Sequence, residues 1–156
     1  MKAKRLFYLF TVLSCLVVAF IFSQSILDRQ ESAAQSGFFA AFFQRLLDPQ
    51  GYIDSEVFHG FIRKAAHFAE FFILGVFTAA STIQLGYIHG RRYITAPMLL
   101  TLATAVADEY LQFFTGRGSQ VTDVVLDYSG ALTGLAATAL LLYILMKLRQ
   151  NKRNPS

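Results

Sequence analysis

The chain has 156 residues, of which 54% are hydrophobic and only 15% are charged, and its mean hydropathy is +0.44. Soluble domains average about 25% charged residues, so this composition excludes an ordinary soluble domain and favours a membrane protein. The formal net charge is +4, but the basic residues stand at the ends of apolar runs, so nucleic-acid binding is not expected. The single cysteine, Cys15, excludes a disulfide framework within the chain.

Four apolar runs follow one another along the chain, at residues 6–22, 61–88, 93–114 and 121–146. Each is long enough to cross about 30 Å of hydrocarbon as a helix. The length of the chain allows one domain. The sequence therefore predicts an all-α membrane protein with four transmembrane helices in a single polytopic domain, 1–156.

The first run has two interpretations. Ser23 and Ser25 are spaced like a weak cleavage site, so the run could be a signal peptide that is removed. The run exceeds the usual apolar core of a signal peptide, which is about 7–15 residues. We therefore favour a retained helix.

Residues 23–60 separate the first two spans. Within this segment, large apolar side chains recur at helical spacing: Phe39, Phe42, Phe43, Leu46 and Leu47. A segment that is amphipathic and too short to span predicts a helix lying in the outer membrane interface. A cap packed on the helix bundle is the alternative that the pattern leaves open.

The basic residues set the orientation of the spans. They gather at the N-terminus, in the connection between spans two and three, and after span four: Lys2, Lys4, Arg5, Arg91, Arg92, Lys147, Arg149, Lys152 and Arg153. Cytoplasmic loops carry an excess of lysine and arginine. We therefore expect both termini and the tail 147–156 in the cytoplasm, and the segment 23–60 outside.

Two polar islands interrupt the apolar pattern, at residues 63–70 and 107–123. Charge within or beside an apolar run of bilayer length is costly and is usually kept for a function. A rise of about 1.5 Å per residue places the acidic groups of spans two, three and four at a similar depth below the outer surface of the membrane. Because facing lipid is unfavourable, we expect one outward-facing polar pocket, with Arg117 above it on a turn that contains two glycines.

The candidate catalytic residues are His67, Glu70, Asp108, Glu109, Asp123 and Asp127, and the candidate binding residues are Lys64, Gln112 and Arg117. Crowded carboxylates suit acid–base chemistry, and a cationic side chain beside a glycine-rich turn suits an anion. A divalent metal is a further option, because carboxylates and histidine are its common ligands. The spacing matches no ligand signature, so no metal ligands are assigned and the cofactor stays open.

The same residues could instead form structural ion pairs that lock the helices together. That interpretation explains one or two pairs well. It explains poorly why acidic groups outnumber basic ones, since excess buried negative charge calls for a proton, a metal or a cationic ligand.

The motifs resemble the VanZ-like family of bacterial membrane proteins. The resemblance rests on Ser23-Gln24-Ser25, Lys64-x-x-His67, Asp108-Glu109-x-x-Gln112, Gly116-Arg117, Asp123 and Gly130, over roughly residues 6–140. The family pattern usually has asparagine at the position of Asp127, which adds a charge here. The resemblance implies a shared site at Lys64, His67, Asp108, Glu109, Gln112, Arg117 and Asp123, whereas Glu70 and Asp127 are added on geometry alone.

The resemblance also implies a bacterial plasma-membrane location and a connection to resistance against the glycopeptide teicoplanin. We therefore expect a protein that interacts with membrane lipids, a lipid-linked cell-wall precursor or a glycopeptide antibiotic. An enzyme acting on a lipid or its phosphate at the outer leaflet is the alternative, so whether the protein is an enzyme stays open. A transporter is less favoured, because the charges cluster at one face and not along a path.

Overall fold

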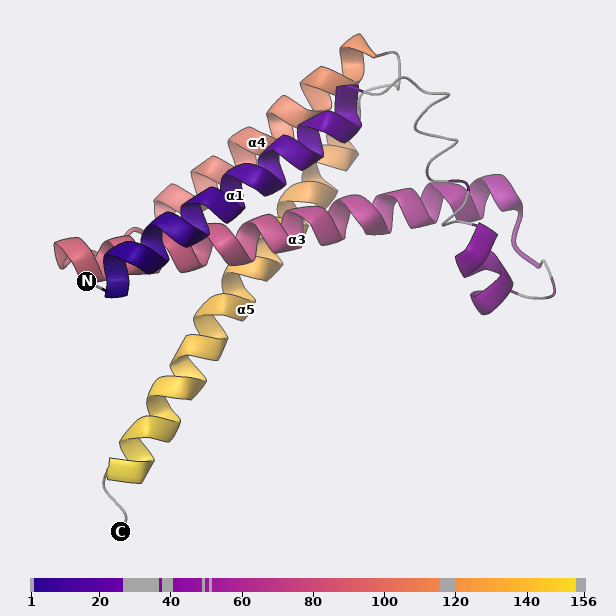
Figure 1. Cartoon of the computed structure of the whole chain (residues 1–156). Coiled ribbons are helices and arrows are strands. Elements are labelled where there is room, and N and C mark those ends of the chain that lie inside the picture. Colours follow the sequence, from indigo (N-terminus) through magenta and orange to yellow (C-terminus); the bar gives the residue numbers. More distant parts are fainter. Residues whose placement is uncertain are drawn as a thin grey trace.

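All regular secondary structure among the described residues is helical (Figure 1). The computed structural model describes residues 2–26, 37, 41–48, 50, 52–115 and 120–153. The long helices are α1 (Lys2–Ile26), α3 (Ser55–His89), α4 (Thr95–Phe114) and α5 (Val121–Arg153). A short helix at residues 41–47 precedes α3. The prediction of an all-α fold is confirmed for this part of the chain.

The helices differ in extent from the apolar runs because caps and helix-forming polar residues set their ends. α3 begins at Ser55, ahead of the expected start of the second span at residue 61. The carboxylate of Asp54 explains this start, since it accepts hydrogen bonds from the backbone N–H groups of Glu56 and Val57. At its other end, α3 stops at Gly90, whose φ of 65° lies in the left-handed region that favours glycine.

Three of the described helices, α1, α3 and α5, are long and apolar enough to cross a membrane. α4 is not among them, although it has 20 residues. The polar residues of its second half, Asp108, Glu109 and Gln112, lower its mean hydropathy, yet all three are buried in the structure. The polarity of these side chains is the reason why α4 does not reach the hydropathy of a candidate span. The described helices therefore confirm three of the four predicted spans as candidates, and the fourth stays a prediction.

The short helix at residues 41–47 exposes its large apolar side chains. Phe42, Phe43, Leu46 and Leu47 are all exposed, as expected for a face that contacts lipid or another surface. Phe39, which the sequence pattern placed on the same face, lies outside the described residues.

α3 is the central helix of the bundle. It packs most extensively on α5 and next on α1, while α4 lies beside α1 (Figure 1). The core at these contacts is formed by Ile21, Phe71, Leu74, Ala105 and Ala131.

Glycines allow α3 and α5 to cross at short distance. A Cβ at Gly75 would lie 2.2 Å from the Ala131 carbonyl oxygen. On α5, a Cβ at Gly130 would lie 2.5 Å from the Phe68 oxygen, and one at Gly134 would lie 2.1 Å from the Phe72 oxygen. These glycines therefore permit close approach of the two helix backbones.

We predict that Gly134→Ala destabilises the folded protein by about 1–3 kcal/mol, because the added methyl group collides with rigid backbone. Thermal unfolding of the full chain in detergent would show this as a lowered Tm. Gly60→Ala is the matched control, since nothing lies within 4 Å of its added Cβ. Equal Tm values for the two variants would contradict the close crossing.

Candidate functional site

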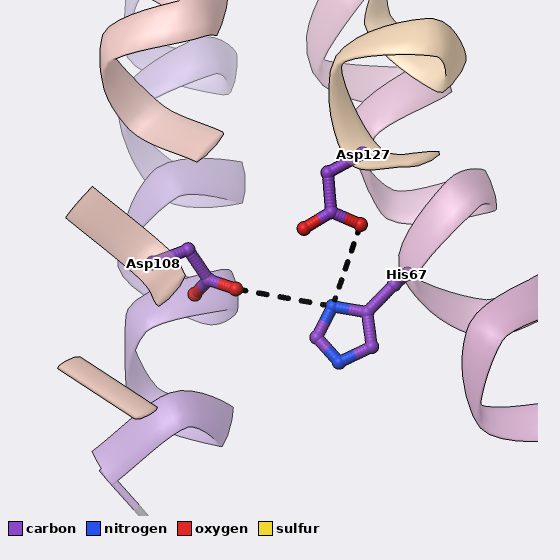
Figure 2. A group of neighbouring side chains, drawn as sticks. All are labelled: His67, Asp108 and Asp127. Atoms are coloured by element: carbon purple, nitrogen blue, oxygen red, sulfur yellow. Dashed lines mark ion pairs between the residues drawn. The ribbon is translucent and has the colours of Figure 1, made fainter. Parts of the chain in front are cut away.

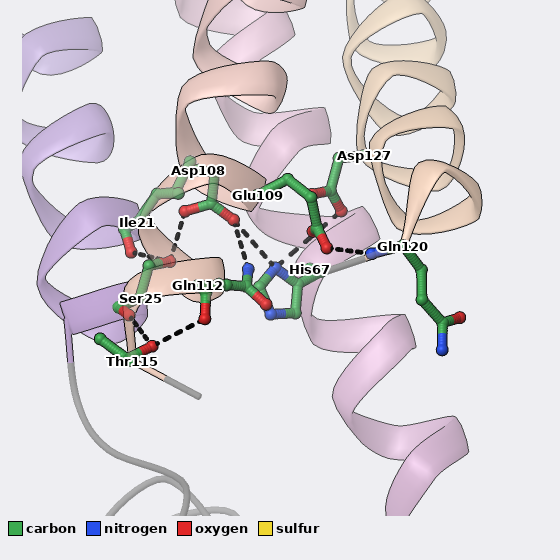
Figure 3. Close-up of polar contacts among 9 residues, drawn as sticks. All are labelled: Ile21, Ser25, His67, Asp108, Glu109, Gln112, Thr115, Gln120 and Asp127. Carbon is green, nitrogen blue, oxygen red and sulfur yellow. Dashed lines mark hydrogen bonds and ion pairs between the residues drawn. The ribbon is translucent and has the colours of Figure 1, made fainter. Parts of the chain in front are cut away.

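The site is built where the C-terminal ends of α1 and α4 meet the N-terminal halves of α3 and α5. α1 contributes Ser25, α3 contributes His67, α4 contributes Asp108 and Gln112, and α5 contributes Asp127 (Figure 3). Each of these polar side chains lies on the side of its helix that faces the bundle. We call these five residues the polar cluster.

Asp108 is the most constrained member of the polar cluster. It is completely buried, and its two oxygens have different partners. Oδ1 accepts a hydrogen bond from the Ser25 hydroxyl, and Oδ2 accepts one from Gln112 Nε2 at 2.7 Å. Asp108 therefore joins the end of α1 to α4, and the carboxylate orientation is fixed from both sides.

Thr115 strengthens the same junction. Its hydroxyl lies 3.1 Å from the backbone oxygens of both Ser25 and Gln112 (Figure 3). The carbonyl oxygens at the ends of α1 and α4 lack partners within their own helices, so a hydroxyl here satisfies groups that would otherwise be unpaired.

His67 lies between two buried carboxylates (Figure 2). Its Nδ1 is 3.9 Å from Asp108 Oδ2 and 3.9 Å from Asp127 Oδ1. These separations are too long for hydrogen bonds. One ring nitrogen thus faces two acidic groups that come from two other helices, and the three ligand-type atoms lie within 4.8 Å of one another.

Asp127 is buried and incompletely satisfied. The residue is only 1% exposed, and no hydrogen-bond partner reaches its Oδ1 within the described part of the chain. Leaving a buried carboxylate oxygen without a donor is unfavourable by several kcal/mol if the group is charged. Asp127 therefore needs a further partner.

Glu109 connects α4 to the start of α5. Its Oε1 accepts a hydrogen bond of 2.5 Å from the backbone N–H of Gln120, immediately before α5 begins. A carboxylate at a helix N-terminus interacts favourably with the helix dipole. Its Oε2 is buried and, like Asp127 Oδ1, has no hydrogen-bond partner among the residues that the structure describes.

A salt bridge stands at the rim of the polar cluster. Lys64 Nζ lies 3.2 Å from Asp123 Oδ1, with side-chain exposures of 48% and 24%. Beside the bridge is a cavity of about 10 Å³, lined by Arg63, Lys64, His67, Gln112, Asp123, Leu126 and Asp127. That volume holds about one water molecule, so only a small group reaches the polar cluster in this conformation.

The structure brings most of the candidate residues together. His67, Asp108, Gln112 and Asp127 form the centre, Lys64 and Asp123 form the rim, and Glu109 lies next to the centre on α4. Glu70 is partly buried one turn further along α3 from His67. Arg117 and the glycines around it lie outside the described residues.

Sequence reasoning assigned no role to Ser25 or Gln120. Ser25 entered only as part of a cleavage-like spacing and of the family pattern. Ser25 lies three residues beyond the predicted end of the first apolar run, so its depth gave no signal; its place in the family pattern is the signal that could have identified it.

The family model described as VanZ/LLP1 matches residues 9–146. The chain belongs to the VanZ/LLP1 family. The matched range includes every residue of the polar cluster and its rim, so the site lies within the part of the chain that defines this VanZ/LLP1 protein. Neither a curated protein nor a solved structure shows significant similarity to the chain.

We predict that Ser25→Ala lowers the free energy of unfolding by about 1–2 kcal/mol, because Asp108 Oδ1 loses a buried donor. Denaturant unfolding in mixed micelles would measure the change. Ser23→Ala is the control, since the exposed Ser23 hydroxyl donates only to Phe20 O of its own helix. A loss for Ser23→Ala as large as that for Ser25→Ala would refute the special role of the Ser25–Asp108 contact.

Proposed function

We propose that this VanZ/LLP1 protein is a four-span protein of the bacterial plasma membrane that binds an amphiphile of the cell envelope at its outer end. α4 serves as the fourth span, because 20 helical residues extend about 30 Å, the thickness of the hydrocarbon region. Its polar residues are compatible with a span because they face the bundle and not the lipid.

In this topology both termini and the connection between α3 and α4, residues 90–94, are cytoplasmic, and the polar cluster lies near the outer leaflet. The short helix at residues 41–47 then lies in the outer interface, where its exposed Phe42, Phe43, Leu46 and Leu47 contact lipid. The distribution of lysine and arginine supports this orientation.

The convergence of polar side chains from four helices is the observation that carries the proposal. Holding Ser25, His67, Asp108 and Asp127 together near the end of an apolar bundle is costly unless a ligand uses them. The rim offers Lys64 and Arg63 to an anionic group, and the small cavity restricts entry to a few atoms of a headgroup.

A groove beside the site supports an apolar portion of the ligand. It has a volume of about 470 Å³ and lies between α1, α3 and α4. Two of its lining residues, Phe22 and Thr104, are about one helical turn from Ser25 and Asp108. An acyl or polyprenyl chain fits this mostly apolar lining, which makes a lipid, a lipid-linked wall precursor or a lipidated glycopeptide the ligand class.

Catalysis on a lipid phosphate is the second candidate function. It is favoured by the position of His67, whose Nδ1 faces two carboxylates while Nε2 points away from them (Figure 2). A carboxylate beside one ring nitrogen orients a histidine for proton transfer at the other. In this candidate His67 is the general base, and the nearby carboxylates of Asp108 and Asp127 stabilise the positive charge that it gains.

The binding proposal predicts that at least one of three probes binds the wild-type protein: phosphatidylglycerol, a polyprenyl diphosphate or teicoplanin. Native mass spectrometry of the full chain gives the affinities. Lys64→Ala and Asp127→Ala should weaken that probe about 10-fold or more, which corresponds to about 1.4 kcal/mol. Glu56→Gln is the control, because Glu56 is exposed in the first turn of α3, and this variant should bind the probe like the wild-type protein.

The same samples separate the two candidate functions. If the wild-type protein releases inorganic phosphate from the polyprenyl diphosphate, and His67→Gln binds this probe but releases none, the result favours the enzyme. Binding without release would favour the binding protein. If Lys64→Ala and Asp127→Ala bind all three probes as tightly as the wild-type protein does, the ligand does not bind at this site.

The topology predicts that cysteines at residues 52 and 91 lie on opposite sides of the membrane. In a Cys15→Ser background, Tyr52→Cys should react with a membrane-impermeant maleimide in intact cells, because Tyr52 is 84% exposed and belongs to the segment that we propose to lie outside. Arg91→Cys should react only after the membrane is permeabilised. Labelling of both in intact cells would refute the orientation.

A further inference from the structure

The polar cluster has the geometry of a metal site. Nδ1 of His67, a carboxylate oxygen of Asp108 and one of Asp127 lie within 4.8 Å of one another (Figure 2). A cation that lies in the plane of these three atoms and is equidistant from them would be about 2.5 Å from each. That distance is in the upper part of the range for Ca²⁺ and a few tenths of an ångström beyond the range for Zn²⁺. Side-chain rotations close so small a difference.

Charge balance favours a divalent cation in this position. Asp108 and Asp127 bring two buried carboxylates to one point, and Oδ1 of Asp127 has no hydrogen-bond partner among the described residues. A divalent cation neutralises both carboxylates at once. It also supplies the partner that Asp127 Oδ1 lacks, and that atom points toward His67.

Neighbouring side chains hold the cluster carboxylates in place, as hydrogen-bonding partners hold metal ligands in known metal sites. Asp108 is held by Ser25 on one oxygen and by Gln112 on the other, so it cannot rotate away. Such hydrogen bonds to ligating carboxylates orient them and tune metal affinity. The adjoining cavity has room for about one water molecule, which would complete the coordination.

We infer that His67, Asp108 and Asp127 bind one divalent transition-metal ion. One imidazole nitrogen with two carboxylates suits Zn²⁺ or Mn²⁺ better than Ca²⁺ or Mg²⁺, which prefer oxygen ligands alone. The inference goes beyond lipid binding and does not depend on it, since metal content is measurable without any lipid ligand. A bound cation would reverse the local charge and so attract an anionic headgroup to a site whose own side chains are mainly acidic.

The test uses the full chain in detergent, purified through an affinity tag without histidine. After stripping with a chelator, the protein is titrated with Zn²⁺, Mn²⁺ or Co²⁺ alone. Elemental analysis measures stoichiometry, thermal unfolding measures stabilisation, and visible absorption of the Co²⁺ form reports on coordination. We expect one equivalent of metal and a Tm that rises with Zn²⁺ or Mn²⁺.

His67→Ala and Asp127→Ala should each lower the affinity at least 10-fold and remove the metal-dependent rise in Tm. His89→Ala is the matched control, because His89 is exposed at the opposite end of α3. If a cluster variant does not fold, Asp127→Asn preserves shape and should give a changed Co²⁺ spectrum and a smaller Tm rise. Failure of wild type to bind any of the three ions, or equal binding by wild type and both cluster variants, would overturn the inference.

Discussion

The structure depends on one constraint: carboxylates on apolar helices must be turned away from lipid and given partners. Asp108 meets this constraint most completely, since it is fully buried and bonded by Ser25 and Gln112. Its position fixes where α1 ends relative to α4. His67 and Asp127 then approach the same point from α3 and α5. The helices therefore meet at this end around polar contacts rather than around apolar packing alone.

Close backbone packing elsewhere makes that arrangement feasible. Gly75, Gly130 and Gly134 remove side-chain bulk where α3 and α5 cross, and Gly130 lies three residues after Asp127. The glycine contacts thus hold Asp127 at a defined depth beside His67. Because two rigid backbones touch there, a shift of α5 along α3 would displace the carboxylate from the histidine. Packing and chemistry are coupled through one short segment of α5.

Much of the fold follows from the sequence, because long apolar runs predict helices and a fixed rise per residue predicts depth. That reasoning placed the acidic groups of spans two, three and four at one depth, and the structure brings Asp108 and Asp127 together with His67. It missed the early start of α3, which depends on the Asp54 cap and not on hydropathy. It also missed Ser25 and Gln120, since neutral groups acquire a role only through a tertiary partner. Membrane orientation and the role of Arg117 remain predictions.

Disulfide formation in native membranes measures whether the helices converge at the polar cluster. In a Cys15→Ser background, cysteines replace Ser25 and Asp108 together, or His67 and Asp127 together, and the yield after mild oxidation is measured by mass spectrometry. Because the Ser25 hydroxyl donates to Asp108 and the His67 and Asp127 side chains point toward each other, both pairs should cross-link more than the control. Ser23 paired with Asp108 is the control, since the Ser23 side chain is exposed. Cross-linking no better than this control would contradict the convergence of the helices on which the account rests.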